Sequence, residues 1–246
     1  MIQERDIDSI AIPPLGSGLG GLSWSDVRDR IVAALGSLDV AVHVYEPSEA
    51  PSARTMAGTV RPPAMTRGRA TPVALMNRYL SGGLDPHVTL IELRKLMYFM
   101  QEAGEPLKLN YRKHIHGPYA DNLRHVLNAM EGYFISGYAD GGDSPGKQIE
   151  LVPGAVEEAD QLLHRHGETR ARFDRVSQLV EGFESPVGME LLATVHWLVR
   201  YEGANDVDQA INATYAWNDG KKRLTRRQIG LAYGLLSEHG WFDGVR

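Results

Sequence analysis

The sequence contains no cysteine, and this absence excludes several kinds of site. Without thiols the chain has no disulfide framework, iron–sulfur cluster, thiolate zinc site or cysteine nucleophile. It also lacks an apolar run near the ~18 residues that a membrane-spanning helix needs. The stretch MIQERDIDSI carries acids where a signal peptide has a basic start and an apolar core. We therefore expect a cytoplasmic protein that does not engage a membrane.

Closely spaced basic residues are also few. The net charge is −5, and cations gather closely only in KKRLTRR, residues 221–227. An acidic chain needs a local basic face of this kind to bind nucleic acid, although a solvated basic turn is the commoner role. The chain is 43% hydrophobic and 23% charged, as globular proteins are. Composition thus indicates a folded protein and leaves DNA binding open.

What the sequence does have at its start is one β-loop-α-β pattern. SIAIPPL (9–15) and VAVHVYE (40–46) have the character of short buried strands, and residues 23–35 between them have helical spacing. The usual crossover makes the two strands parallel. Residues 51–70 lose this periodicity and are rich in proline and arginine, which is typical of a linker. We predict a first domain over 1–50, followed by this linker.

Residues 71–246 are predicted to form a mainly helical domain. Thr89 and Glu92 form a T-x-x-E capping box before an apolar stripe that is expected in the core. That stripe consists of Leu96, Met97, Phe99 and Met100. Helices followed by two strands around the glycine-rich tip ADGGDSPG resemble a winged-helix core with a helical extension. The predicted fold class is therefore α+β, a βαβ remnant followed by a mainly α-helical domain with a winged-helix-like hairpin.

The loop between the first strand and its helix, IPPLGSGLGGLSW (12–24), is the densest glycine motif. Gly16, Gly18 and Gly21 satisfy G-x-G-x-x-G, a pattern typical of phosphate-binding loops and weak when it stands alone. Glu46, at the end of the second strand, would suit the ribose of a dinucleotide. The further strands of a doubly wound sheet are missing downstream, which counts against that interpretation. A glycine-rich turn without a ligand is the alternative.

The whole string IPPLGSGLGGLSWSDVRDRI, followed by VAVHVYEP, resembles the second ligand loop, helix and last strand of a macrodomain. It is most similar to the macrodomain of DNA ADP-ribosyl glycohydrolase antitoxins, the DarG family that is paired with DarT toxins. The resemblance implies a loop that wraps the diphosphate and distal ribose of ADP-ribose through backbone N–H groups. The residues so implied are Gly16, Ser17, Gly18, Leu19 and Gly20.

Two residues of that family have no counterpart in this sequence. In the family a catalytic lysine and an asparagine near the ribose lie upstream of this loop. Here the first lysine is Lys95 and the first asparagine is Asn77. We therefore expect a truncated macrodomain over 1–50, which binds ADP-ribose weakly at most and is inactive as a glycohydrolase. No catalytic residue, metal or cofactor is assigned.

The second domain resembles the region that follows the macrodomain in DarG proteins. The likeness lies in LRKLMYFMQEAG, YRKHIHGPYADNLRHVL and GYFISGY. It implies a domain that binds and neutralises a DarT-like ADP-ribosyltransferase toxin directly, without chemistry. This antitoxin is the first hypothesis, and the alternatives are a glycohydrolase acting on DNA thymidine and a winged-helix DNA-binding regulator. A DNA-binding regulator should have a basic recognition helix. The helix expected in PYADNLRHVLNAME disfavours this alternative, because it has only Arg124 and His125 as possible cations.

One set of candidate partner-binding residues surrounds HIHGPY, which we expect to form a turn before a helix that starts at Gly117-Pro118. The candidates are Lys113, His114, His116 and Tyr119. His114 and His116 would project to the same side of a strand, as two metal ligands do. No third ligand is identifiable near them, so ordinary hydrogen-bonded histidines are the favoured interpretation.

A second candidate set consists of acids near the end of residues 181–208, namely Glu202, Asp206 and Asp208. A toxin that modifies DNA presents a basic groove to its substrate. An inhibitor can occupy that groove with acidic groups that complement it. The alternative role for these acids is in helix caps and solvated faces.

Overall fold

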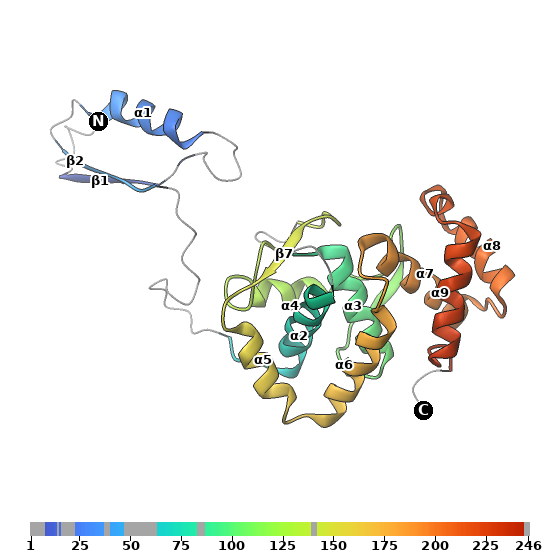
Figure 1. Cartoon of the computed structure of the whole chain (residues 1–246). Coiled ribbons are helices and arrows are strands. Elements are labelled where there is room, and N and C mark those ends of the chain that lie inside the picture. The colour runs from blue at the N-terminus through green and yellow to red at the C-terminus, as the bar shows by residue number, and fades with distance from the viewer. Residues whose placement is uncertain are drawn as a thin grey trace. The chain divides into compact units, whose positions relative to one another are not determined.

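The computed structural model describes residues 8–13, 15, 23–36, 40–46, 63–82, 87–138 and 142–243 (Figure 1). The chain divides into two compact units, Met1–Met56 and Ala57–Arg246. The amino-terminal unit contains β1 (Ser9–Ile12), α1 (Trp24–Leu35) and β2 (Ala41–Val44). Its two strands are parallel, with Ser9 opposite Ala41 and Ile12 opposite Val44, so the predicted parallel pairing is confirmed.

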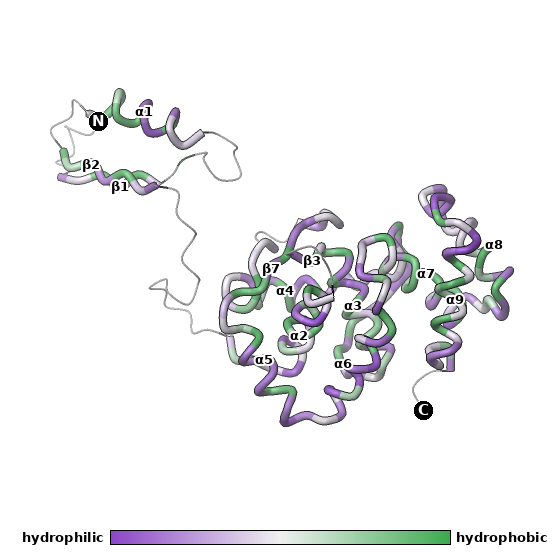
Figure 2. The backbone as a smooth tube through the Cα atoms, viewed as in Figure 1, coloured by the Kyte–Doolittle hydropathy of each residue, from purple (hydrophilic) through white to green (hydrophobic). Residues whose placement is uncertain are grey.

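Few of the described residues of the amino-terminal unit are buried. Ile12 is its one described residue that counts as buried, and no described residue of α1 is buried. Hydrophilic and hydrophobic residues alternate around α1 in Figure 2. The helix expected from the residue spacing is present as α1. Its described residues stay partly or fully exposed because a single βαβ unit cannot cover both faces of its own strands.

The second unit is mixed helix and sheet, which confirms the α+β class. Its helices are α2 (Arg67–Gly82), α3 (Leu90–Glu102), α4 (Leu123–Met130), α5 (Ala155–Leu163), α6 (Gly167–Val180), α7 (Pro186–Glu202), α8 (Val207–Trp217) and α9 (Arg226–Glu238), with a 3₁₀ turn at Asp219–Arg223. Its strands are β3 (Val88–Thr89), β4 (Tyr111–His114), β5 (Gly117–Ala120), β6 (Ile135–Ser136) and β7 (Gln148–Leu151). The helix α2 begins inside the stretch 51–70 that the sequence assigned to a linker.

The helix α3 forms the centre of this unit. Every residue from Leu90 to Met100 is buried, and the helix packs against α2, α6 and α7. The predicted capping box is present at its start, where the Thr89 backbone N–H donates to the Glu92 carboxylate at 2.7 Å. The predicted apolar stripe lies in the core, with each of its side chains at most 1% exposed, which confirms that prediction.

Two small sheets flank the helices. The predicted pairing of β6 with β7 is confirmed and antiparallel, but β7 also pairs with β3, so it is the middle strand of the order β3-β7-β6. The strands β4 and β5 form a separate antiparallel hairpin. The expectation of a helix from Gly117-Pro118 is wrong, because these residues begin β5 and α4 starts only at Leu123.

The carboxyl-terminal helices gather around α7. Ser185 caps α7 by accepting from the Gly188 N–H, and Gly203 ends the helix in the left-handed region with φ +77°. The helices α8 and α9 lie side by side next to α7 (Figure 1). Among the described helices none combines the length and the apolar character needed to cross a membrane.

Candidate functional site

The loop Gly16–Gly20, with Ser17 and Leu19, lies outside the described residues. Its described neighbours are the end of β1 and the start of α1, which has Ser23 at its N-cap. The strand and helix on either side of the motif are thus present. The assignment of this loop to ADP-ribose stays a prediction.

The β4–β5 hairpin determines the position of the first candidate set. His114 pairs with Gly117 and Lys113 with Pro118, so His114, Ile115 and His116 form the turn side of the hairpin. Gly117 has φ +92°, and a Cβ added there would lie 3.1 Å from the Thr194 hydroxyl oxygen. A residue without a side chain is required, because the hairpin backbone packs directly against α7 at this point.

A small cleft opens between this hairpin and α3, and we call it the hairpin cleft. Six polar or charged residues line it: Arg94, Lys95, His114, His116, Tyr119 and Asp143. Three of them belong to the first candidate set. The structure therefore brings most of that set to one place, together with cations that the sequence analysis did not single out.

On one side of the hairpin cleft, Arg94 forms an ion pair with Asp143. The Tyr119 hydroxyl donates to the same carboxylate at 2.8 Å, and the Arg94 guanidinium lies 4.8 Å from the centre of the Tyr119 ring. Burial and the hydrogen bond to Asp143 raise the pKa of Tyr119 to about 12. Burial would raise the pKa of Asp143, but the bonds from Arg94 and Tyr119 hold it below its usual value.

Lys95 lies deeper in the hairpin cleft and is 2% exposed. Its ammonium donates to the Pro118 carbonyl at 2.7 Å. Burial, followed by the nearby charge of Lys221, lowers the pKa of Lys95 to about 7. A lysine that titrates near neutral pH in a cleft marks a candidate functional site, because burial and neighbouring charges have to be arranged to produce it.

Behind the hairpin cleft lies a buried ion cluster around Glu190 of α7. One Glu190 oxygen accepts from Lys221 at 2.8 Å and from Arg223 at 3.0 Å, and the other lies 3.1 Å from His116 Nδ1. Lys221 is fully buried and also donates to the Thr194 hydroxyl at 2.9 Å. Burial would raise the pKa of Glu190, but Lys221 and Arg223 lower it below the usual value.

This cluster holds the carboxyl-terminal helices against the hairpin. Lys221 comes from the stretch KKRLTRR, where we predicted a solvated basic turn or a surface for DNA or an acidic partner. For Lys221 that expectation is wrong, since it is fully buried and pairs with Glu190, whereas Arg223 pairs with the same carboxylate and is itself exposed. Two side chains nearby extend the contact: Trp217 donates to the His114 carbonyl at 2.8 Å and Asn218 to the Ile115 carbonyl at 3.0 Å.

The second candidate set lies on the surface where α7 ends and α8 begins. Glu202 accepts from Lys113 at 2.7 Å and from the Trp197 indole at 3.1 Å, so it joins the two candidate sets. Asp206 caps α8 by accepting from the Gln209 N–H at 2.8 Å. Asp208 pairs with Arg226 at 2.7 Å. All three acids are exposed, and each also has a local structural role.

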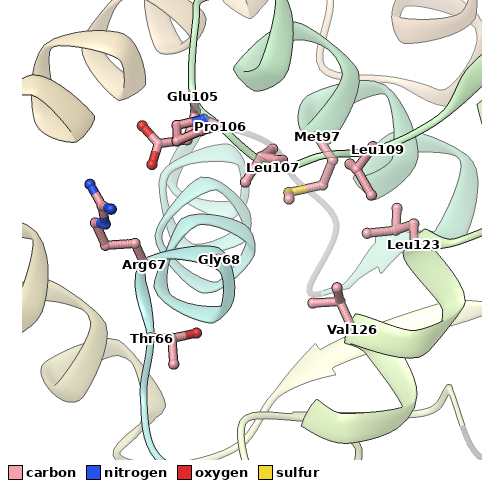
Figure 3. Close-up of a pocket in the computed structure, with 10 residues that line it drawn as sticks. All are labelled: Thr66, Arg67, Gly68, Met97, Glu105, Pro106, Leu107, Leu109, Leu123 and Val126. Carbon is pink, nitrogen blue, oxygen red and sulfur yellow. The ribbon is translucent and has the colours of Figure 1, made fainter.

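A larger cavity of about 260 Å³ lies elsewhere in the unit, between α2, α3 and α4. Figure 3 shows Thr66 and Arg67 on one side, with Met97, Leu123 and Val126 facing them. Glu105 at its rim is already engaged by Arg172 at 2.9 Å and by the Thr169 hydroxyl at 3.2 Å. This cavity lacks the convergent polar groups of the hairpin cleft and is the weaker candidate site.

No group of three or more His, Asp or Glu side chains that could hold a metal occurs among the residues that the structure describes. The sequence analysis missed Arg94, Lys95 and Glu190 as site residues. A signal for two of them was present in LIELRKLMYFM, where adjacent cations interrupt an otherwise apolar helix. A charged pair inside a buried run needs partners or a site, because isolated buried charges are costly.

Comparison with known proteins found no matching family model. Over 241 residues, or 97% of its length, the chain is 42% identical to a DNA ADP-ribosyl glycohydrolase of Thermus aquaticus and spans 66% of that protein. It is 37% identical to the DNA ADP-ribosyl glycohydrolase of Mycobacterium tuberculosis, covering 69% of that relative. Over 47 residues it is 43% identical to a DNA ADP-ribosyl transferase–DNA ADP-ribosyl glycohydrolase fusion protein of Thermosipho africanus. The chain thus spans about two thirds of the length of the first two relatives.

Proposed function

Because the chain belongs to the family of DNA ADP-ribosyl glycohydrolases, we propose that its helical unit acts as an antitoxin domain that binds and neutralises a DNA ADP-ribosyl transferase. The fusion relative supports this pairing, since its name places a transferase and a glycohydrolase in one polypeptide. Covalent linkage raises the effective concentration of one part for the other, which favours parts that act together.

The observation that carries the proposal is the acidic edge, which we define as Glu202, Asp206 and Asp208. These three carboxylates are exposed within one short segment that joins α7 to α8. A transferase that modifies DNA has a basic substrate groove. An exposed row of acids complements such a groove and speeds association with it.

Apolar side chains accompany the acidic edge. Tyr201 is 52% exposed and Val207 is also exposed, and both belong to the same segment. Gly230 of α9 lies against Val207, since a Cβ added to it would be 3.9 Å away, and Leu231 of the same helix is 58% exposed. Aromatic and aliphatic groups beside charged ones are typical of protein interfaces.

The test is binding of the cognate transferase to a variant that loses charge and keeps the N-cap of α8. Glu202→Gln, Asp206→Asn and Asp208→Asn together remove three negative charges, while asparagine still caps α8. We expect slower association and a weaker dependence of affinity on salt, with a loss of roughly 2–5 kcal/mol for each acid that is fully desolvated. Surface plasmon resonance at two salt concentrations measures both.

A matched variant neutralises three exposed acids on α5, on α6 and at the C-cap of α6: Glu157→Gln, Glu168→Gln and Glu181→Gln. It changes the net charge equally and is expected to bind with nearly the affinity of the wild type. Equal losses in both variants would show that total charge matters and the acidic edge does not. An unchanged affinity and salt slope in the first variant would contradict the proposal.

Glycohydrolase activity is a second candidate, favoured by the names of the relatives. In this proposal the amino-terminal unit belongs to a macrodomain, and Gly16–Gly20 would bind ADP-ribose. We expect the 246-residue chain to release no ADP-ribose from thymidine-modified DNA, since it has no lysine before Lys95 and no asparagine before Asn77. Release above a protein-free blank would refute this expectation.

The third candidate, a winged-helix DNA-binding regulator, ranks below both. Its recognition helix would be α4, where Arg124 is paired with Asp121 at 3.4 Å and His125 is the other cation. Phosphate contacts need several unpaired cations on one face. Tight, sequence-selective binding of duplex DNA at physiological salt would restore this candidate.

A further inference from the structure

Basic side chains outnumber acidic ones among the described residues that line the hairpin cleft. Arg94 and Lys95 line it from α3, and His114 and His116 line it from the hairpin. Among the described residues that line the cleft, Asp143 is the one carboxylate, because Glu190 lies behind the cleft and is already paired with Lys221 and Arg223. An excess of basic groups around a concave surface favours an anionic ligand.

Arg94 and Lys95 each have hydrogen-bond donors that are not used within the described part of the chain. Arg94 Nε is buried and has no hydrogen-bond partner among the residues that the structure describes, and the arginine as a whole is 8% exposed. The Lys95 ammonium has three N–H donors and donates to one acceptor, the Pro118 carbonyl. Buried donors without partners are rare in folded proteins, and a missing ligand is one of their recognised explanations.

Asp143 occupies the position that an external anion would take. Its side chain is 60% exposed, whereas the Arg94 side chain that it neutralises is 9% exposed. It lies outside any helix or strand, in the segment that precedes β7. A carboxylate that reaches a buried guanidinium from the surface can be replaced there by another anion, because Arg binds carboxylate and phosphate with the same forked geometry.

We propose that the hairpin cleft binds a phosphate group, which displaces the Asp143 carboxylate from Arg94 and accepts further hydrogen bonds from Lys95. Phosphate fits better than a second carboxylate, because it offers more acceptor oxygens to donors that approach from several directions. The imidazole of His114, which is exposed and lies 4.8 Å from the Tyr119 ring, provides a flat surface for a nucleobase attached to that phosphate.

The cleft is narrow while Asp143 is in place. Its volume is about 40 Å³, which suits a water molecule rather than a phosphate. Removing the charge of Asp143 weakens its hold on Arg94 and therefore removes a competitor for the incoming phosphate. The proposal therefore predicts that a substitution of a surface residue, Asp143→Asn, increases the affinity for phosphate.

The test is isothermal titration of the full 246-residue chain with inorganic phosphate at constant ionic strength. Asp143→Asn is expected to bind phosphate roughly tenfold more tightly than the wild type. Asp174→Asn on α6 is the matched control, because Asp174 is also exposed and paired with an arginine, Arg170, at 3.2 Å. This control is expected to match the wild type, and Lys95→Met is expected to lose most of the binding.

Two further ligands identify the source of the phosphate. Tighter binding of AMP than of inorganic phosphate indicates a free nucleotide, and tighter binding of a short thymidine oligomer indicates single-stranded DNA. In either case the gain from Asp143→Asn has to persist. The proposal is overturned if Asp143→Asn binds no more tightly than the wild type, or if Lys95→Met retains wild-type affinity.

Discussion

The two units of this chain differ in how much of themselves they bury. In the amino-terminal unit Ile12 is the one buried residue among those described, whereas α3 in the second unit is buried along eleven consecutive positions. Both α1 and α3 follow from helical periodicity in the sequence. Periodicity therefore predicts a helix, and the number of elements around it determines how strongly that helix is held.

The second unit also buries charges, which no described residue of the first unit does. Glu190, Lys221 and Lys95 lie together beneath the hairpin. A buried charge costs free energy unless its partners are well placed, so this region is sensitive to the loss of a single group. The contrast between the units can be tested by substitutions of graded effect.

The largest effect is expected at Glu190. Glu190→Gln leaves the fully buried Lys221 without its counter-ion and should lower the free energy of unfolding by roughly 3–5 kcal/mol. Lys221→Met should cost less, because Glu190 keeps Arg223 and His116. Urea denaturation measures both, with Asp174→Asn as a surface control. Equal costs for the two cluster variants would contradict this account.

Next in size is a pair of core and surface truncations. Leu96→Ala on α3, where the side chain is 1% exposed, should cost about 2–5 kcal/mol because it leaves a cavity. Val32→Ala on α1, where the side chain is 58% exposed, should change the free energy of unfolding by no more than about 0.5 kcal/mol. Denaturant titration of both variants checks the comparison. Similar costs would mean that α1 is packed as α3 is.

The pH dependence of stability should reveal Lys95. Below pH 7 Lys95 is charged in both the folded and unfolded states, and the cost of burying that charge is fully present. Above pH 7 the folded state releases the proton first, so stability should rise by up to about 1.4 kcal/mol per pH unit. The window closes near pH 10, where Tyr98 and Tyr111, whose pKa values burial raises, begin to ionise in the unfolded chain.

The measurement is the free energy of unfolding from pH 7 to 9.5 in the wild type and in Lys95→Met. The slope should be shallower in the variant. Lys221 contributes in the same direction, since burial lowers its pKa too, and Glu190, whose pKa Lys221 and Arg223 lower, stays charged over this range. Identical slopes would show that Lys95 is not the titrating group.

The smallest difference between paired variants is expected at helix caps. Thr225→Ala removes a capping box from α9, where the Thr225 hydroxyl accepts from the Gln228 N–H, and should cost about 1 kcal/mol. Ser23→Ala on α1 should cost less, because the Ser23 side chain makes no capping hydrogen bond. The thermal unfolding midpoints of the two variants show which substitution destabilises the protein more. A larger effect from Ser23 would reverse the comparison between the units.

Local patterns predicted much of the fold. The capping box of Thr89 and Glu92, the apolar stripe of α3 and the parallel βαβ unit all depend on residues close together in the sequence, and all are present. The helix expected from Gly117-Pro118 was wrong for a tertiary reason. These residues pair with β4 and pack against α7, and that pairing outweighs the local tendency of proline to begin a helix.

The sequence by itself determined the helical character of the second unit and the family resemblance of the glycine loop, because both depend on residue spacing along the chain. The tertiary structure alone decided that Lys95, Glu190 and Lys221 form one site. These residues come from α3, α7 and the turn before α9, and nothing in their spacing relates them. The lowered pKa of Lys95 arises from burial and from the nearby charge of Lys221, which exist only once the helices have packed.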